Sequence, residues 1–176
     1  MISKNWLPSG GLYLVRCHSG ISYTIILYKL YIMKISRIRE VKLPERGTVG
    51  SAGIDFFIPK DFPEVVLEPQ RSILIPSGIK VNIPKGMAMI AFNKSGIATK
   101  HKCLVGACVV DEDYQGEVHI HLINSGDRPV ILSPDMKIIQ FVVLAIDNCI
   151  LEEVELNNLY LEESERGTGG FGSTGE

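Results

Sequence analysis

The chain has 176 residues, of which 45% are hydrophobic and 22% are charged, and its formal net charge is -2. This length fits one domain with a sizeable core, and the composition is that of an ordinary globular protein. A net charge so near zero leaves no broad basic surface for a nucleic-acid backbone, so we expect no nucleic-acid partner. A small anionic ligand needs only a few local cations and stays compatible with this charge.

The first 32 residues differ in character from the rest of the chain. Residues 21–33 are apolar and aromatic, but this stretch is too short for a membrane span and Lys29 interrupts it. No small-residue cleavage site follows, which argues against a signal peptide. We therefore expect residues 1–32 to be an extension outside the functional domain, with Met33 as the natural start. We also expect an intracellular protein, cytoplasmic or nuclear, that is neither secreted nor bound to a membrane.

From Met33 onward the sequence consists of short strand patterns separated by turn signals. Val118, Ile120 and Leu122 alternate with two histidines, the period-two pattern of a half-buried strand. One short helix is predicted after Lys94. Strands are predicted at 35–43, 54–58, 72–83, 87–92, 105–110, 118–124, 129–132, 137–146 and 150–156. This spacing indicates an all-β domain over residues 33–160, a jelly-roll-like barrel or sandwich.

The most acidic turn of the chain follows the apolar run 105–110 and reads Asp-Glu-Asp-Tyr-Gln-Gly-Glu over residues 111–117. A carboxylate at the end of a buried strand is held rigidly, and a partly desolvated one can act as a general base. A solvated acidic hairpin would have the same sequence. Taken alone, this segment favours the hairpin interpretation.

Two further segments offer groups that suit an anion or a metal ion. Lys94-Ser95-Gly96 presents a cation, a hydroxyl and free backbone N–H groups at the predicted start of the helix, although Ser95 could simply cap that helix. Asp55 follows the small residues 50–53 and could serve a metal ion directly or through water.

Metal or thiol chemistry has weaker support in the sequence. His119 and His121 lie on one face of a predicted strand, but a third metal ligand is not evident. The spacing of Cys17, Cys103, Cys108 and Cys149 matches no zinc pattern, and reduced thiols are the simpler interpretation.

The C-terminal residues 166–176 contain five glycines, one arginine, one phenylalanine and three hydroxyl residues. Glycines let backbone N–H groups turn toward phosphate oxygens, while Arg166 fits a phosphate and Phe171 offers a flat face for a base. A disordered Gly/Ser terminus is the alternative. We interpret residues 161–176 as an arm that closes over a ligand.

Five of these segments, in this order, resemble the five motifs of the homotrimeric dUTPase family (dUTP diphosphatases). The resemblance covers residues 33–176, and the third and fifth motifs are the most specific. The matching segments are Ser51-Ala-Gly-Ile-Asp55, Lys94-Ser-Gly-Ile-Ala98, Val105-Gly-Ala-Cys-Val-Val-Asp-Glu-Asp-Tyr-Gln-Gly-Glu117, Lys137-Ile-Ile-Gln140 and Arg166-Gly-Thr-Gly-Gly-Phe-Gly-Ser-Thr-Gly175.

The resemblance implies a jelly-roll subunit, a homotrimer with active sites between subunits, and Mg²⁺-dependent hydrolysis of dUTP to dUMP and diphosphate. Asp111 matches the general base, Tyr114 the residue under the deoxyribose, and Asp55 an aspartate near the metal-bound triphosphate. The remaining matches are to substrate-binding residues. They are Lys94, Ser95 and Gly96 at the phosphates, Cys108, Val109, Val110 and His119 at the uracil, Gln140 of the fourth motif, and Arg166, Phe171, Gly172, Ser173 and Thr174 of an arm that completes a neighbouring subunit's site.

Some residues depart from the family pattern. Lys94 stands where arginine is usual, Cys108 where glycine is frequent, and Met136-Lys137 where Asp-Arg is usual. These departures leave the strictness of uracil specificity open. A dCTP deaminase on the same fold is disfavoured because its Ser-x-x-Ala-Arg pattern is absent, and a non-catalytic nucleotide sensor is disfavoured because Asp111 and the arm are present.

Overall fold

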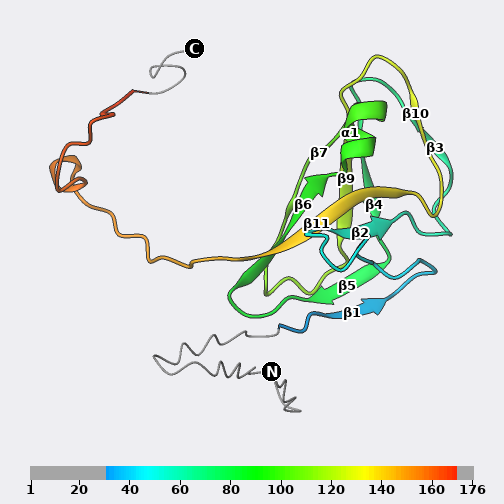
Figure 1. Ribbon diagram of the computed structural model, residues 1–176, viewed down its shortest axis with the longest axis horizontal. Coiled ribbons are helices and arrows are strands. Elements are labelled where there is room, and N and C mark those ends of the chain that lie inside the picture. Colours follow the sequence, from blue (N-terminus) through cyan, green and yellow to red (C-terminus); the bar gives the residue numbers. More distant parts are fainter. Residues whose placement is uncertain (1–30, 170–176) are drawn as a thin grey trace, which may run out of the picture. The chain divides into compact units, whose positions relative to one another are not determined.

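The computed structural model describes residues 31–169 (Figure 1), and they belong to two units that divide between Ile146 and Asp147. The proposed extension 1–32 and the tip of the tail therefore lie almost wholly outside the described residues. The first unit contains all the strands within the described range. No helix in the part of the chain that the structure describes is long and apolar enough to cross a membrane.

The first unit is built from four antiparallel sheets, which confirms the predicted all-β class. A four-stranded sheet has the order β2 (Ile54–Phe57), β11 (Lys137–Ala145), β6 (Met87–Asn93) and β8 (Val109–Val110). A three-stranded sheet has the order β4 (Ser72–Pro76), β9 (His119–Asn124) and β7 (Cys103–Val105). Two pairs complete the unit, β1 (Lys34–Arg37) with β5 (Ile79–Asn82) and β3 (Val65–Leu67) with β10 (Val130–Leu132) (Figure 1).

The core lies where the inner faces of these sheets meet. Phe56 of β2 and Phe141 of β11 are fully buried, with ring centroids 4.6 Å apart. The predicted alternation of β9 is confirmed, because Ile120 and Leu122 are buried while His119 is exposed. Every described residue of the buried core cluster lies in the range from Val41 to Phe141, within the first unit.

The single predicted helix is present as α1 (Ser95–His101), directly after β6. Its N-cap is Lys94 rather than Ser95, and the Lys94 carbonyl accepts the N–H of Ala98 at 2.8 Å. The interpretation of Ser95 as the capping residue was therefore wrong. Lys94 and Ser95 together mark the point where the chain leaves the large sheet.

Three predicted strands differ in the structure because pairing partners, rather than local pattern, decide where a strand ends. The run 72–83 is divided at Gly78, whose φ of 73° no strand residue adopts. The run 105–110 is divided between two sheets, as β7 and β8. The predicted strand 35–43 is confined to β1.

The second unit, described up to residue 169, has no strand in that range, so the predicted strand 150–156 was wrong. It contains a short 3-10 helix, η1 (Leu156–Asn158), and a turn in which the Gly169 N–H donates to the Arg166 carbonyl at 2.9 Å. Ile150 and Leu151 are almost fully exposed. Within the described part of the chain, neither residue is paired with a strand of any sheet.

Candidate active site

A cavity of about 170 Å³ opens where the chain passes from β7 to β8. β7 pairs with β9, and the ladder ends at the Gly106 N–H, which donates to the His121 carbonyl at 3.0 Å. From Val109 onward the chain pairs with β6 instead. The two sheets separate at this point, and the cavity is lined by Leu74, Ala107, Cys108, Val109, Val110, Asp111, Tyr114, Val118, His119, His121 and Phe141.

Six of the predicted site residues line this cavity together: Cys108, Val109, Val110, Asp111, Tyr114 and His119. One detail of the prediction was wrong. β8 is not a buried strand, since Val109 is 59% exposed, and Asp111 is exposed as well. The segment 111–117 is also not a hairpin turn, because it connects strands of two different sheets.

The turn 111–117 is held by its own hydrogen bonds. The Tyr114 hydroxyl donates to the Glu117 carbonyl at 2.9 Å, and the Tyr114 N–H donates to the Asp111 carbonyl at 3.2 Å. Gly116 is required beneath the ring, because a Cβ there would lie 2.3 Å from the Tyr114 hydroxyl oxygen. The ring of Tyr114 therefore lies against its own turn and borders the cavity.

Glu117 fixes this turn to the rest of the unit. Its side chain is only 16% exposed, and its Oε1 accepts the Gly78 N–H at 2.7 Å. The same oxygen lies 3.3 Å from the Arg39 Nε. A charge-assisted bond of this kind is about twice as strong as a neutral one, so the turn is anchored at its C-terminal end.

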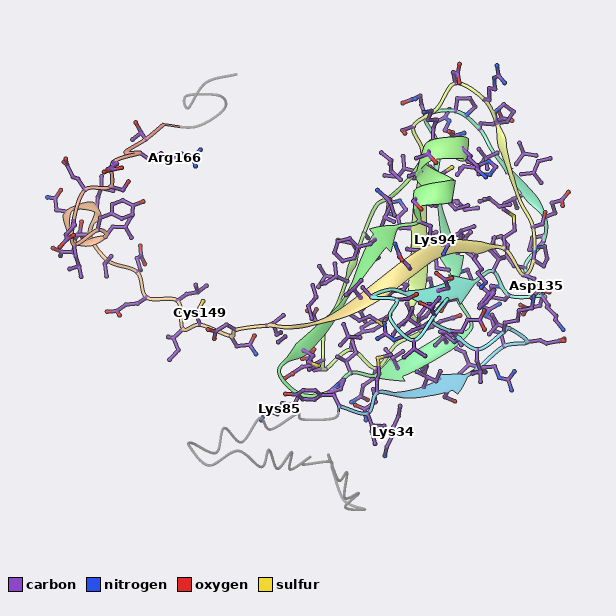
Figure 2. All side chains as sticks on the ribbon, viewed as in Figure 1. Lys34, Lys85, Lys94, Asp135, Cys149 and Arg166 are labelled. Atoms are coloured by element: carbon purple, nitrogen blue, oxygen red, sulfur yellow. The ribbon has the colours of Figure 1, made fainter. Side chains whose placement is uncertain are left out.

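A second group of predicted residues lies on the large sheet. Asp55 of β2 is 7% exposed, and its Oδ1 is 2.5 Å from the Lys94 Nζ. Lys137 of β11 approaches the other carboxylate oxygen at 3.7 Å and Glu45 at 2.8 Å. The hydrogen bond to Glu45, with a smaller contribution from Asp55, raises the pKa of the Lys137 ammonium. Figure 2 shows Lys94 where β6 ends and α1 begins.

Gln140 belongs to this second group. It pairs with Asp55 across β11 and β2, and its Nε2 donates to the Asn93 carbonyl at 2.8 Å. Gly53 makes this possible, because a Cβ at that position would lie 2.2 Å from the Gln140 Oε1. Among the small residues 50–53, Gly53 is therefore the one that lies against Gln140. Ser95 and Gly96 follow Lys94 in the first turn of α1.

The two groups lie on opposite faces of the large sheet. Gln140 and Phe141 are neighbours on β11, and neighbouring strand residues point to opposite sides. Phe141 lines the cavity, whereas Gln140 faces Asp55. One copy of the chain therefore presents the cavity on one side of β11 and the lysine-containing group on the other.

The remaining predicted residues lie in or beyond the second unit. The Arg166 Nε donates to the Gly169 carbonyl at 2.8 Å, so its guanidinium is held on its own turn. Phe171, Gly172, Ser173 and Thr174 lie outside the described residues. Among residues 31–169, no cluster of three histidine, cysteine or carboxylate side chains is arranged to hold a metal ion. His119 and His121 both border the cavity.

Comparisons with known proteins identify the family of this chain. The model of the dUTPase family matches residues 39–175, which is most of the chain. The chain belongs to the dUTPase family. A deoxyuridine 5'-triphosphate nucleotidohydrolase of Chlamydia trachomatis is 39% identical over 136 residues, covering 76% of this chain and 91% of that relative.

Solved dUTPases have the same fold, which confirms the predicted jelly-roll-like architecture. A Staphylococcus bacteriophage 80alpha dUTPase mutant with dUpNHpp has a TM-score of 0.72 at 23% identity, covering 84% of this chain and all of that one. A mutant dUTPase of phage phi11, described as coordinating a structural Mg(II) ion, has a TM-score of 0.65 at 23% identity, covering 71% of this chain and 97% of that one.

Sequence reasoning missed several residues of this dUTPase site. Leu74 and Phe141 line the cavity from β4 and β11, and no local pattern distinguishes them from ordinary core residues. Glu117 was read only as part of an acidic turn. Its pairing with Arg39 and Gly78 depends on contacts across 78 and 39 residues of chain, which the sequence does not display.

Proposed function

We propose that this chain hydrolyses dUTP to dUMP and diphosphate, using Mg²⁺, and thereby limits uracil incorporation into DNA while supplying dUMP for dTMP synthesis. The observation that carries the proposal is the cavity between β7, β8 and β9. Residues of the most specific dUTPase segment line it side by side, with Asp111 at the point where the chain leaves β8. Membership of the family supplies the substrate.

In this proposal the cavity receives uracil. Residues 108–110 and His119 line it, and donors and acceptors at fixed positions can match the edge of one base and reject another. Tyr114 borders the same cavity and supports the deoxyribose. Asp111 accepts a proton from the water that attacks the α-phosphorus, a role that requires reach and orientation first.

The group on the other face of the sheet binds the triphosphate. Lys94 and Lys137 bring two ammonium groups to one place, and Ser95 and Gly96 add a hydroxyl and backbone N–H groups. Asp55 holds the two lysines in position, since each contacts one oxygen of its carboxylate. Phosphoryl transfer depends mainly on positioning and charge neutralisation, which is what this group offers. Gln140 fixes Asn93, the residue before Lys94.

A complete site requires a second copy of the chain. A single copy presents its cavity and its lysine group on opposite faces of one sheet, so one nucleotide reaches both only between copies. The sheet face that carries Gln140 also exposes Phe92 and Leu144, at 45% and 43%. An exposed apolar face of this kind supports self-association. We propose a homotrimer in which residues 161–176 close a neighbour's site, with Arg166, Phe171, Gly172, Ser173 and Thr174 on the nucleotide.

Magnesium fits this site only as an ion carried largely by the substrate. The residues the structure describes offer it single carboxylates rather than a cluster, and Asp55 already contacts two lysines. Mg²⁺ commonly binds through one or two carboxylates plus substrate phosphates and keeps several waters. When bound, it supplies neutralisation of the phosphate charge. Asp55 would contact it through water.

An assay that follows diphosphate and ammonia separately, with dUTP, dCTP and dTTP as substrates, tests the proposed reaction. We expect diphosphate from dUTP and no ammonia from any substrate, with activity lost when EDTA removes divalent ions. Ammonia from dCTP would instead identify a deaminase. The absence of turnover with all three nucleotides in the presence of Mg²⁺ would indicate a nucleotide-binding protein without this activity.

A further inference from the structure

Ala107 stands at the fork between the two sheets, and its backbone N–H has a side-chain acceptor. Gly106 makes the last bond of the β7–β9 ladder, and the Cys108 carbonyl already accepts from Ala91 of β6 at 2.8 Å. Between them, the Ala107 N–H donates to the Nδ1 of His121 at 2.8 Å. An imidazole nitrogen accepts a hydrogen bond only when it carries no proton, so Nδ1 is the accepting nitrogen of the His121 ring in this arrangement.

The sequence leaves room for this imidazole at one place. A Cβ on Gly106 would lie 2.1 Å from the His121 Nδ1 and 2.5 Å from its Cε1. The ring therefore lies directly against the Gly106 backbone, in the space that any other residue would fill. Both His121 and Ala107 line the cavity, so the bond between them is part of the cavity wall.

We propose that His121 is a positioning residue for the pyrimidine: its Nδ1 fixes the Ala107 amide and thereby sets the width of the cavity and the affinity for the base. This inference rests on the proposed assignment of the cavity to uracil. The backbone of residues 107–110 forms one wall, and Ala107 is where that wall leaves β9. Without the acceptor, the Ala107 N–H turns to another partner and the wall moves with it.

Turnover should respond less than affinity to the loss of this bond. Asp111 and Tyr114 belong to a turn with separate anchors, namely the Gly78 N–H and Arg39 on Glu117. The groups that face His121 differ from these anchors of the turn. They are the Gly106 and Ala107 backbone of the same fork, Leu74 paired with it on β4, and His119, Asp111 and Tyr114 around the cavity.

Three substitutions at this one position separate the acceptor from the bulk of the ring. His121→Asn places an amide oxygen near the position of Nδ1, His121→Gln places it about one bond farther out, and His121→Leu removes it. We expect the KM for dUTP to rise about three- to tenfold in the Leu and Gln variants, to stay within about twofold in the Asn variant, and kcat to change little in all three. Thermal melting of each variant shows that it is folded.

A Cys108→Phe variant, which fills the cavity, separates this inference from the proposed function. If Cys108→Phe raises the KM strongly and the three His121 variants follow the expected order, both stand. If Cys108→Phe raises the KM and the Asn and Leu variants behave alike, the role of His121 is wrong and the cavity assignment stands. If a folded Cys108→Phe variant has an unchanged KM, uracil does not bind in this cavity, and the inference falls with that assignment.

Discussion

At the scale of single residues, the proposed chemistry rests on one exposed carboxylate. Asp111 borders the cavity at the end of β8, while its neighbours Glu112 and Asp113 belong to the same turn and do not line that cavity. The acidic turn thus contains one carboxylate that borders the proposed uracil cavity. The neighbouring carboxylates are close to Asp111 in sequence but do not line the cavity. This difference offers a matched comparison within three residues.

Asp111→Asn should leave the protein folded and lower kcat about 10²–10⁴-fold, because the amide cannot take a proton from water. Asp113→Asn removes the same charge from the same turn and should retain nearly full activity. Steady-state diphosphate release with purified variants measures both. Equal activities of the two variants would show that Asp111 is not the base.

Cys103 allows a prediction about protonation. It is 1% exposed, and burial raises the pKa of its thiol above the ordinary value. The folded state disfavours the thiolate, so this contribution to stability is present below about pH 9 and is lost as the pH rises through the folded pKa. Alkylation at pH 8 followed by mass spectrometry should modify the exposed Cys149 quickly and Cys103 only after unfolding. Rapid modification of Cys103 in the folded protein would contradict its burial.

At the scale of elements, the catalytic turn depends on a bond to a distant turn. Glu117 receives the N–H of Gly78, a residue that the break between β4 and β5 places at φ 73°. Gly78 also lies against Arg39 and Val41. A Cβ at this position would lie only 3.0 Å from the nearest side-chain atom of each. The Asp111–Glu117 turn is therefore positioned from its C-terminal end by residues outside the five motif segments.

Glu117→Ala removes an acceptor from Gly78 and a partner from Arg39, and we expect a stability loss of about 1–3 kcal/mol together with a lower kcat. Glu117→Gln keeps the acceptor and should recover most of the stability. Chemical denaturation and steady-state kinetics measure the two effects. If both variants kept wild-type kcat, Glu117 would hold the fold without positioning the turn.

The elements also show how far the sequence alone could lead. Strand existence followed from period-two alternation, as at Ile120 and Leu122, and α1 followed from the change of pattern after Lys94. The local sequence pattern does not show which strand each strand pairs with. β7 and β8 form one apolar run in the sequence but join different sheets, and the cavity exists because of that separation. The three-residue strand β3 was missed because its apolar pattern is too short to recognise.

At the scale of the whole molecule, the tail belongs to a different unit from the strands. The buried cluster ends at Phe141, and residues 147–169 contribute no buried hydrophobic residue to it. Truncation before Arg166 should leave the melting temperature nearly unchanged and reduce dUTP hydrolysis severely, because in the proposed function the arm acts on the ligand. Calorimetry and kinetics on the truncated protein test this. A large fall in melting temperature would show that the tail is structural instead.

The candidate site was also predictable only in part. The sequence order identified the residues of both groups, but it did not show that β11 separates them. Gln140 and Phe141 are adjacent in sequence and point to opposite sides of the sheet, which follows from the pairing of β11 with β2 and β6. This geometry makes the site incomplete in one copy, so the assembly is the central claim about the molecule.

Mixing two inactive variants tests that claim most directly. Asp111→Asn disables the cavity group and Lys94→Gln the phosphate group, and each pure variant should have little activity. Co-refolding them in equal amounts should restore about one quarter of the wild-type activity, because random assembly gives that share of sites two intact groups from different copies. If verified mixed oligomers showed no recovery, both groups would act within one chain, and the shared site would be wrong.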